Sequence, residues 1–228
     1  MTLSTAANTV TEQLTEAGRA IEHDSFAIID AEAGPHAYTD EQWPLVRRMI
    51  HANADFEFNG LTAFHPDAMQ AGMQAVLKGG TPIVADVEMI CVGLSKPRLA
   101  HFGLSTHHYI SDADVIEAAQ AANSTRAVQA MRKAHGLGKL DGAIVGIGNA
   151  PTALIELVRL IREEGVRPAL VVAMPVGFVS AAESKDLMMT VPEVPWVAIK
   201  GRKGGSTLVV AAIHAMLSPA EAEQKKAA

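Results

Sequence analysis

The stretch Ala143-Ile-Val-Gly-Ile-Gly-Asn-Ala-Pro-Thr-Ala-Leu154 decides the fold class. It begins with an almost wholly apolar run, typical of a strand that is covered on both faces. A glycine-rich turn follows, and Pro151 suits the first turn of a helix. Apolar residues then recur on one helical face before Gly165, at Leu154, Leu157, Val158 and Ile161. The stretch therefore predicts half of a βαβ unit.

The same alternation of short strands and longer helices extends over the chain. Further strands are predicted at 83–87, 108–110, 169–174 and 196–200, and helices at 7–33, 40–52, 66–77, 112–122, 124–134 and 205–217. We therefore predict one α/β domain over residues 1–228, with a doubly wound, mostly parallel sheet of about five strands. Its core spans 21–217, after an N-terminal helical arm (1–20) and before a frayed tail (219–228).

Composition narrows the class of protein. The 228 residues are 49% hydrophobic, 4% aromatic and 19% charged, with a net charge of -6. This acidic balance argues against nucleic-acid binding, although a basic pocket could still bind a small anion. The lone Cys91 excludes an internal disulfide and a cysteine-based zinc site. No stretch is typical of a signal peptide or a membrane span, so a cytoplasmic protein is expected.

Three glycine-rich loops follow predicted strands, at residues 146–151, 174–178 and 201–206. Ligands of parallel sheets bind at this edge, where helix N-termini offer N–H groups to anions. We predict a single anion-accepting pocket there, with Arg202 and Lys203 as an anion clamp. Each loop taken alone is more simply a tight turn, and neither a dinucleotide fingerprint nor a P-loop is present.

The histidines show no metal-ligand spacing, and no metal site is predicted. A site built from His101, His107 or His108 is the alternative. His51 differs because it falls at the end of the helix predicted over 40–52, where the helix dipole favours a protonated imidazole. Such a side chain can act as a general acid, or it can simply cap the helix.

Six segments carry a further pattern. In chain order they are His51-Ala-Asn-Ala-Asp-Phe, Ile83-Val-Ala-Asp-Val-Glu-Met, Asn123-Ser-Thr-Arg126-Ala, Gly146-Ile-Gly-Asn-Ala-Pro-Thr-Ala-Leu154, Pro175-Val-Gly-Phe-Val-Ser-Ala-Ala-Glu-Ser-Lys185 and Gly201-Arg-Lys-Gly-Gly-Ser206. Together they resemble the precorrin-8X methylmutase family, also called precorrin isomerases. The resemblance runs from about Ile21 to Leu217.

The resemblance implies an isomerase of cobalamin biosynthesis that uses no cofactor. It would move a methyl group from C-11 to C-12 of precorrin-8X or cobalt-precorrin-8, giving hydrogenobyrinate or cobyrinate, and the cobalt form is favoured. The family also implies a homodimer with active sites at the subunit interface, while charge and the lack of an apolar span argue against a nucleic-acid or membrane partner. A non-catalytic corrinoid carrier and an enzyme acting on a small anion are the alternatives.

Carried over by position, His51 resembles the family's catalytic histidine, which donates a proton or hydrogen bond to ring C. Ser25 and Arg126 resemble pocket residues, whose simpler roles would be a helix cap and a surface ion pair. The other expected substrate contacts come from the three loops: Gly148, Asn149, Gly177, Arg202, Lys203, Gly204, Gly205 and Ser206. Residues 100–109 depart from the family pattern, and their contacts stay open.

Overall fold

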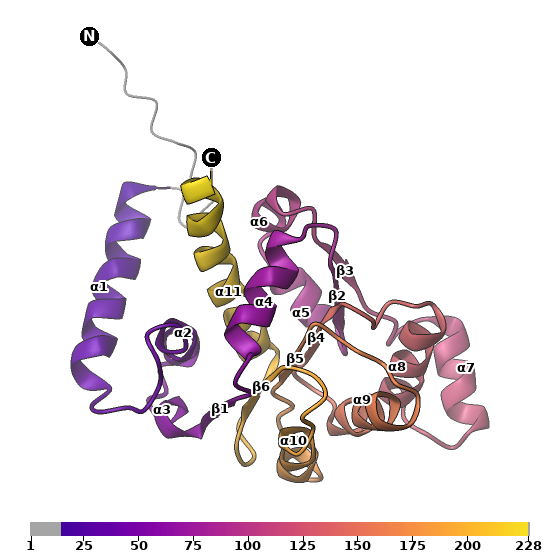
Figure 1. Ribbon diagram of the computed structural model, residues 1–228. Coiled ribbons are helices and arrows are strands. Elements are labelled where there is room, and N and C mark those ends of the chain that lie inside the picture. The colour runs from indigo at the N-terminus through magenta and orange to yellow at the C-terminus, as the bar shows by residue number, and fades with distance from the viewer. Residues whose placement is uncertain (1–14, 228) are drawn as a thin grey trace.

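The sheet is centred on the strand that the sequence marks most clearly. β4 (Ile144–Ile147) is buried at every position and lies between β2 (Pro82–Ala85) and β5 (Leu170–Ala173). β6 (Trp196–Ile199) pairs with the far side of β5, and all four strands run parallel. The computed structural model describes residues 15–227 (Figure 1).

Two edge strands complete the sheet, whose order is β1-β6-β5-β4-β2-β3. β1 (Thr62–Phe64) pairs antiparallel with β6, and it was not predicted because three residues are too few to show a period. β3 (Ser105–His107) pairs parallel with β2. The prediction of a strand at 108–110 is wrong, because the segment that pairs with β2 is the one just before it, with Ser105 to His107 opposite Pro82 to Val84.

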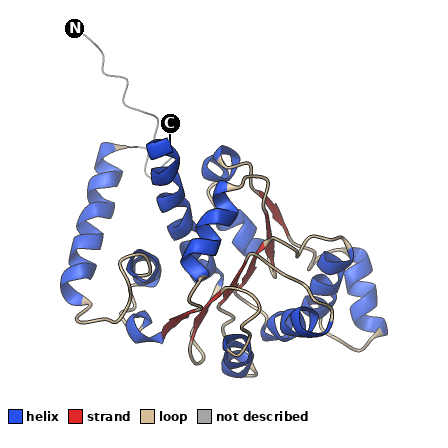
Figure 2. Cartoon of the chain, viewed as in Figure 1, coloured by secondary structure: helices blue, strands red, loops and turns tan. Residues whose placement is uncertain are grey.

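Helices cover both faces of the sheet, as Figures 1 and 2 show, which confirms the doubly wound α/β class. One face carries α4 (Ala68–Leu77), α5 (Glu88–Gly93) and α11 (Ser206–Ala227). The other carries α8 (Arg126–Gly136), α9 (Pro151–Glu163) and α10 (Ala181–Met189). Shorter or outer helices are α3 (Phe58–Leu61), α6 (Lys96–His101) and α7 (Ala113–Ala121).

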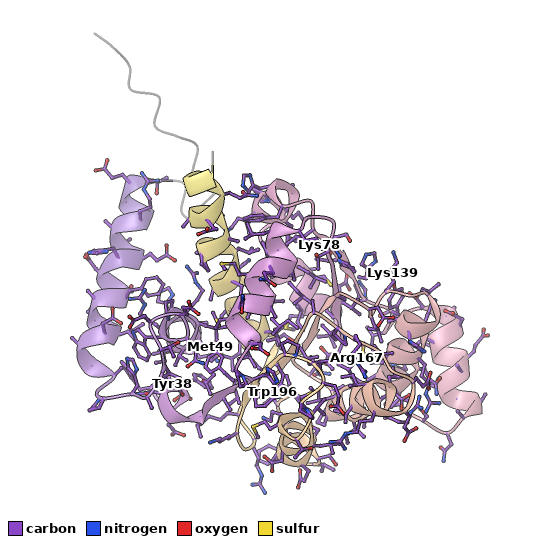
Figure 3. All side chains as sticks on the ribbon, in the orientation of Figure 1. Tyr38, Met49, Lys78, Lys139, Arg167 and Trp196 are labelled. Atoms are coloured by element: carbon purple, nitrogen blue, oxygen red, sulfur yellow. The ribbon has the colours of Figure 1, made fainter. Side chains whose placement is uncertain are left out.

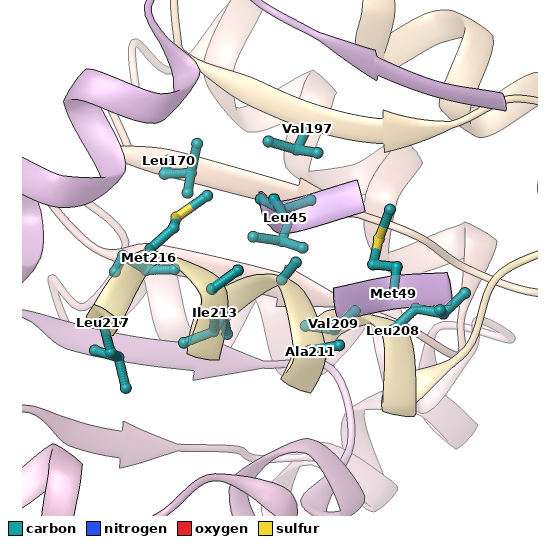
Figure 4. Packing of buried hydrophobic residues seen from close by; sticks show 14 of the residues in the cluster. Leu45, Met49, Leu170, Val197, Leu208, Val209, Ala211, Ile213, Met216 and Leu217 are labelled. Carbon is teal, nitrogen blue, oxygen red and sulfur yellow. The ribbon is translucent and has the colours of Figure 1, made fainter. Parts of the chain in front are cut away.

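The larger core determines where the N-terminal helices lie. α2 (Trp43–Asn53) packs along α11, with Leu45 and Met49 buried against Leu208 and neighbouring side chains (Figure 4). Side chains fill the space between these helices and the sheet (Figure 3). α1 (Glu16–Glu32) packs on the outside of α2. This order, α1 on α2 on α11, brings the end of α2 beside the start of α11.

The helix termini correct three predictions. α2 starts at Trp43 rather than residue 40, since Pro44 suits a first turn. α11 does not stop at 217, and 219–227 is helical rather than frayed. A buried ion pair accounts for the longer helix. The Arg98 Nε of α6 lies 3.0 Å from the Glu221 Oε1 and holds this last part of α11 in place. The predicted helix start at residue 7 lies outside the described residues.

Candidate active site at the carboxyl edge of the sheet

The three glycine-rich loops meet at one place, which confirms their predicted convergence; we call residues 146–151, 174–180 and 201–206 the rim. A side chain at Gly148 would place its Cβ 2.7 Å from the Ser206 Cα, so only glycine allows this approach. At Gly204 a Cβ would overlap the carbonyl oxygen of Met174. The rim is therefore a closely packed backbone structure that leads from three strands into three helices.

The backbone N–H groups at the start of α9 are not available to a ligand in this structure. Asp86, fully buried after β2, accepts hydrogen bonds from the N–H groups of Gly148 (3.0 Å), Asn149 (2.9 Å) and Ala150 (2.7 Å). Burial raises the pKa of Asp86, while the three N–H groups favour its charged form. The expected anion site on these N–H groups of Gly148 and Asn149 is therefore already filled by the protein's own carboxylate.

His51 lies in the last turn of α2, as predicted, and its side chain is exposed. Its ring packs edge to face on Phe26 of α1, with ring centres 5.3 Å apart. Two residues later, Asn53 accepts a hydrogen bond from the Thr207 hydroxyl at 3.3 Å. This bond links the end of α2 to the first turn of α11, so His51 lies beside the rim.

Ser25 belongs to the same part of the molecule. Its hydroxyl donates to the Ile21 carbonyl within α1 at 2.7 Å, and the side chain is half-buried. The next residue, Phe26, is the one that packs on His51. The contact between α1 and α2 thus places the residue next to Ser25 against His51, although the two helices are separate in sequence.

The two members of the predicted anion clamp differ in their surroundings. The Lys203 ammonium pairs with the carboxylates of Asp55 and Glu57, the latter at 3.0 Å. The hydrogen bond to Lys203 lowers the pKa of Asp55, and the two carboxylates together raise the pKa of Lys203. Asp55 and Glu57 therefore neutralise Lys203 and fasten the 201–206 loop to the segment that follows α2.

The other two predicted cations are free of carboxylates. Within residues 15–227, neither Arg126 nor Arg202 makes an ion pair, and both are exposed. Arg126 opens α8, whose N-cap Thr125 shares a hydrogen bond with Thr152 of α9 at 3.0 Å. Arg126 therefore flanks the rim at the start of α9, and Arg202 lies in the rim itself. Both can bind an anionic ligand.

Comparison with known proteins identifies the family of the chain. A model of the family described as Precorrin-8X methylmutase matches residues 20–219. The chain belongs to the precorrin-8X methylmutase family. It is therefore an enzyme of the isomerase class with a role in cobalamin biosynthesis.

Individual methylmutases are similar to this protein over nearly the whole length of its chain. The cobalt-precorrin-8 methylmutase of Leptospira interrogans is 52% identical over 210 residues, which cover 90% of this chain and 95% of that protein. The precorrin-8X methylmutase of a Sinorhizobium species is 38% identical over 203 residues, covering 89% and 95%. The solved structure of precorrin-8x methyl mutase from Thermus thermophilus has a TM-score of 0.84 at 51% identity, covering 90% and 97%.

Two of the three histidines considered for a metal site have hydrogen-bond partners, whereas the buried Nδ1 of His108 has none within residues 15–227. His101 bonds with Gln224 at 2.9 Å and His107 with Ser105 at 3.0 Å. Among the described residues, no cluster of three histidine, cysteine, aspartate or glutamate side chains could hold a metal ion. In the same part of the chain, no helix is long and apolar enough to span a membrane.

Lys185 of α10 is a contributor to the site that sequence reasoning did not assign. Its side chain is fully buried, and the ammonium donates to the Lys203 carbonyl at 2.6 Å. Burial lowers the pKa of Lys185 to about 8. The available signal in the sequence for this role was a lysine within a helix that lacks a clear polar face. Lys185 positions the rim from beneath.

We expect the stability of the methylmutase to depend on Lys185 in alkaline solution. Between pH 8 and 10 the unfolded chain keeps a proton on this lysine that the folded chain has released, so the folded state gains as pH rises. Relative to Lys185→Met, the wild-type protein should gain about 2 kcal/mol in free energy of unfolding between pH 7 and pH 10.

Urea unfolding at the two pH values measures this difference. Lys78→Met, at an exposed lysine after α4, controls for the loss of one lysine charge. A gap between wild type and Lys185→Met that stays constant or moves in the opposite direction would contradict the assignment of Lys185 as a buried, easily deprotonated group.

Proposed function

We propose that this methylmutase moves a methyl group from C-11 to C-12 of cobalt-precorrin-8 or precorrin-8X, giving cobyrinate or hydrogenobyrinate. The observation that carries the proposal is the placement of His51. An exposed imidazole at a helix C-terminus lies beside a rim that holds Arg202, with Arg126 at its flank. This combination offers one proton donor and two cations to an anionic ring.

The proposed reaction requires the protein to bind the substrate and to supply one proton or hydrogen bond. The bond from the methyl carbon to C-11 breaks as the bond to C-12 forms, so the molecular formula is unchanged and no oxidant or methyl donor is consumed. Such a rearrangement is accelerated by holding the ring in a reactive orientation and by a proton or hydrogen bond at the reacting region. His51 is proposed to supply that proton or hydrogen bond to ring C, with Ser25 in the same pocket.

Substrate orientation is assigned to the free cations. The ring carries acetate and propionate groups, and guanidinium groups bind carboxylates in a fixed geometry. Arg126 and Arg202 are proposed to bind two of these groups. The charge of Lys203 is matched by Asp55 and Glu57, so Lys203 is assigned a structural part in the site. It is proposed to form the floor of the site together with Gly177, Gly204, Gly205 and Ser206.

The exposed position of His51 also supports a dimeric site. In a single protomer the imidazole faces solvent, whereas proton transfer to a macrocycle is favoured where water is excluded. We therefore propose a homodimer whose second subunit covers the site, working in the cytoplasm. No resident cofactor or metal is part of the proposal.

The test is incubation with metal-free and cobalt-loaded precursor side by side, followed by absorbance as ring conjugation is completed. The proteins at 52% and 51% identity in Leptospira interrogans and Priestia megaterium are cobalt-precorrin-8 methylmutases, which supports faster conversion of the cobalt form. Conversion of neither form would contradict the proposal. Binding of sugar phosphates without binding of tetrapyrroles would instead support an enzyme acting on a small anion.

A further inference from the structure

The loop after β5 displays three apolar side chains to solvent, of which Val176, 44% exposed, is the least exposed. Phe178 is 84% exposed and the adjacent Val179 is 82% exposed. Neither belongs to the cores on the two faces of the sheet. An apolar pair exposed beside a ligand-binding rim indicates contact with another apolar surface.

The exposure does not come from a loosely held backbone. Three hydrogen bonds tie this loop and α10 to the neighbouring 201–206 loop: Gly177 N–H to the Arg202 carbonyl (3.2 Å), Gly205 N–H to the Met174 carbonyl (2.9 Å) and Lys185 Nζ to the Lys203 carbonyl (2.6 Å). Ser180, two residues after Phe178, holds a left-handed φ of 60°. Strained backbone of this kind persists where the surroundings hold it, often at ligand sites. The loop therefore presents Phe178 and Val179 in a fixed position.

A cation accompanies the apolar pair. The Arg202 guanidinium carbon lies 5.6 Å from the centre of the Phe178 ring. Within residues 15–227 this guanidinium has no carboxylate partner. The backbone bond between Gly177 and Arg202 holds the main chain of Arg202 beside the loop that carries the ring. An apolar face and a free cation thus form one composite surface.

We propose that Phe178 and Val179 form the surface on which the flat corrinoid ring lies, with Arg202 binding a carboxylate on its edge. This inference rests on the proposed function and names the residues that recognise the ring face. Aromatic and aliphatic side chains bind flat conjugated rings through stacking and burial of apolar area. An acidic protein needs a local cation for a polyanionic ligand, and Arg202 supplies it at the edge of this surface.

The experiment compares corrinoid affinity in Phe178→Ala, Phe178→Tyr and Arg202→Ala with that of the wild-type protein. The probes are hydrogenobyrinate and cobyrinate, the proposed products, in absorbance titrations at two salt concentrations. Leu137→Ala is the matched control, because Leu137 is also an exposed apolar residue but lies at the far end of α8. Sedimentation velocity records the oligomeric state of each variant.

We expect Phe178→Ala to raise Kd about tenfold, equivalent to about 1.4 kcal/mol. Phe178→Tyr, which keeps the ring, should bind like wild type, and so should Leu137→Ala. Arg202→Ala should weaken binding and reduce its dependence on salt, since it removes an ion pair. Unchanged thermal unfolding is expected for each variant, because the side chains are exposed.

Two results would overturn the inference. One is a Kd for Phe178→Ala indistinguishable from that of wild type, while wild type binds the corrinoid. The other is weaker binding that accompanies a change in oligomeric state, which would make Phe178 a contact between subunits. Failure of the wild-type protein to bind either corrinoid would instead remove the proposed function, and this inference with it.

Discussion

Replacement of Asp86 by alanine should lower the free energy of unfolding by about 3 kcal/mol. The carboxylate accepts from three successive N–H groups at the start of α9, and no other side chain among the described residues bonds to them. Gly148 is buried, so its N–H would lose its partner without gaining water. The other two N–H groups are more accessible and can be hydrated, which limits the total loss.

Urea unfolding measures the loss, and Asp141→Ala is the matched control. Asp141 is an exposed aspartate that accepts a single hydrogen bond, from the Arg167 N–H at 2.7 Å. Its removal should cost about 1 kcal/mol or less. Equal losses in the two variants would contradict this prediction, because Asp86 would then stabilise the fold no more than an exposed aspartate with one hydrogen bond does. Asp86→Asn keeps the shape but must place an amide group near N–H donors, so it should fall between wild type and Asp86→Ala.

Replacement of His51 by alanine should reduce conversion by about a thousandfold and leave corrinoid affinity nearly unchanged. The imidazole is exposed, and among the described residues it makes no hydrogen bond or ion pair and one ring contact, with Phe26, so the fold depends little on it. The carboxylates of the ligand are assigned to Arg126 and Arg202, which the substitution leaves in place. The effect should therefore fall on the chemical step.

Absorbance under single-turnover conditions separates binding from conversion in this variant. His51→Gln keeps a hydrogen-bond donor but cannot transfer a proton, so it distinguishes the two proposed roles of the imidazole. His23→Ala, at an exposed histidine of α1, controls for the loss of a histidine near the same helices. Undiminished conversion by His51→Ala would remove the catalytic assignment.

The fold was predictable where hydrophobic periodicity is strong. The central strands are apolar at every position, and α9 carries a continuous apolar face, so β4 and α9 were placed correctly to within a residue or two. β1 was missed because it is short and gains its place by pairing with β6. α10 was missed because it lacks a clear apolar face and buries Ser184 and Lys185.

The candidate site was predictable in outline and not in its internal contacts. Topology alone brings the loops after parallel strands to one edge, which is why the rim was foreseen. Asp86 accepts a hydrogen bond from a residue 62 positions later in the sequence, and Lys203 pairs with a residue 148 positions earlier. No local pattern shows such contacts. The sequence therefore assigns to the ligand the N–H groups that bond to Asp86 and the lysine that pairs with Asp55 and Glu57.

Catalysis distinguishes this methylmutase from a protein that merely carries its corrinoid. The most direct test of catalysis is incubation of limiting enzyme with a large excess of cobalt-precorrin-8 or precorrin-8X, with absorbance followed to completion. We expect the wild-type protein to convert all of the precursor over many turnovers, and His51→Ala to convert it about a thousandfold more slowly. A precursor that binds one to one and keeps its spectrum would contradict this expectation, and would identify a carrier instead.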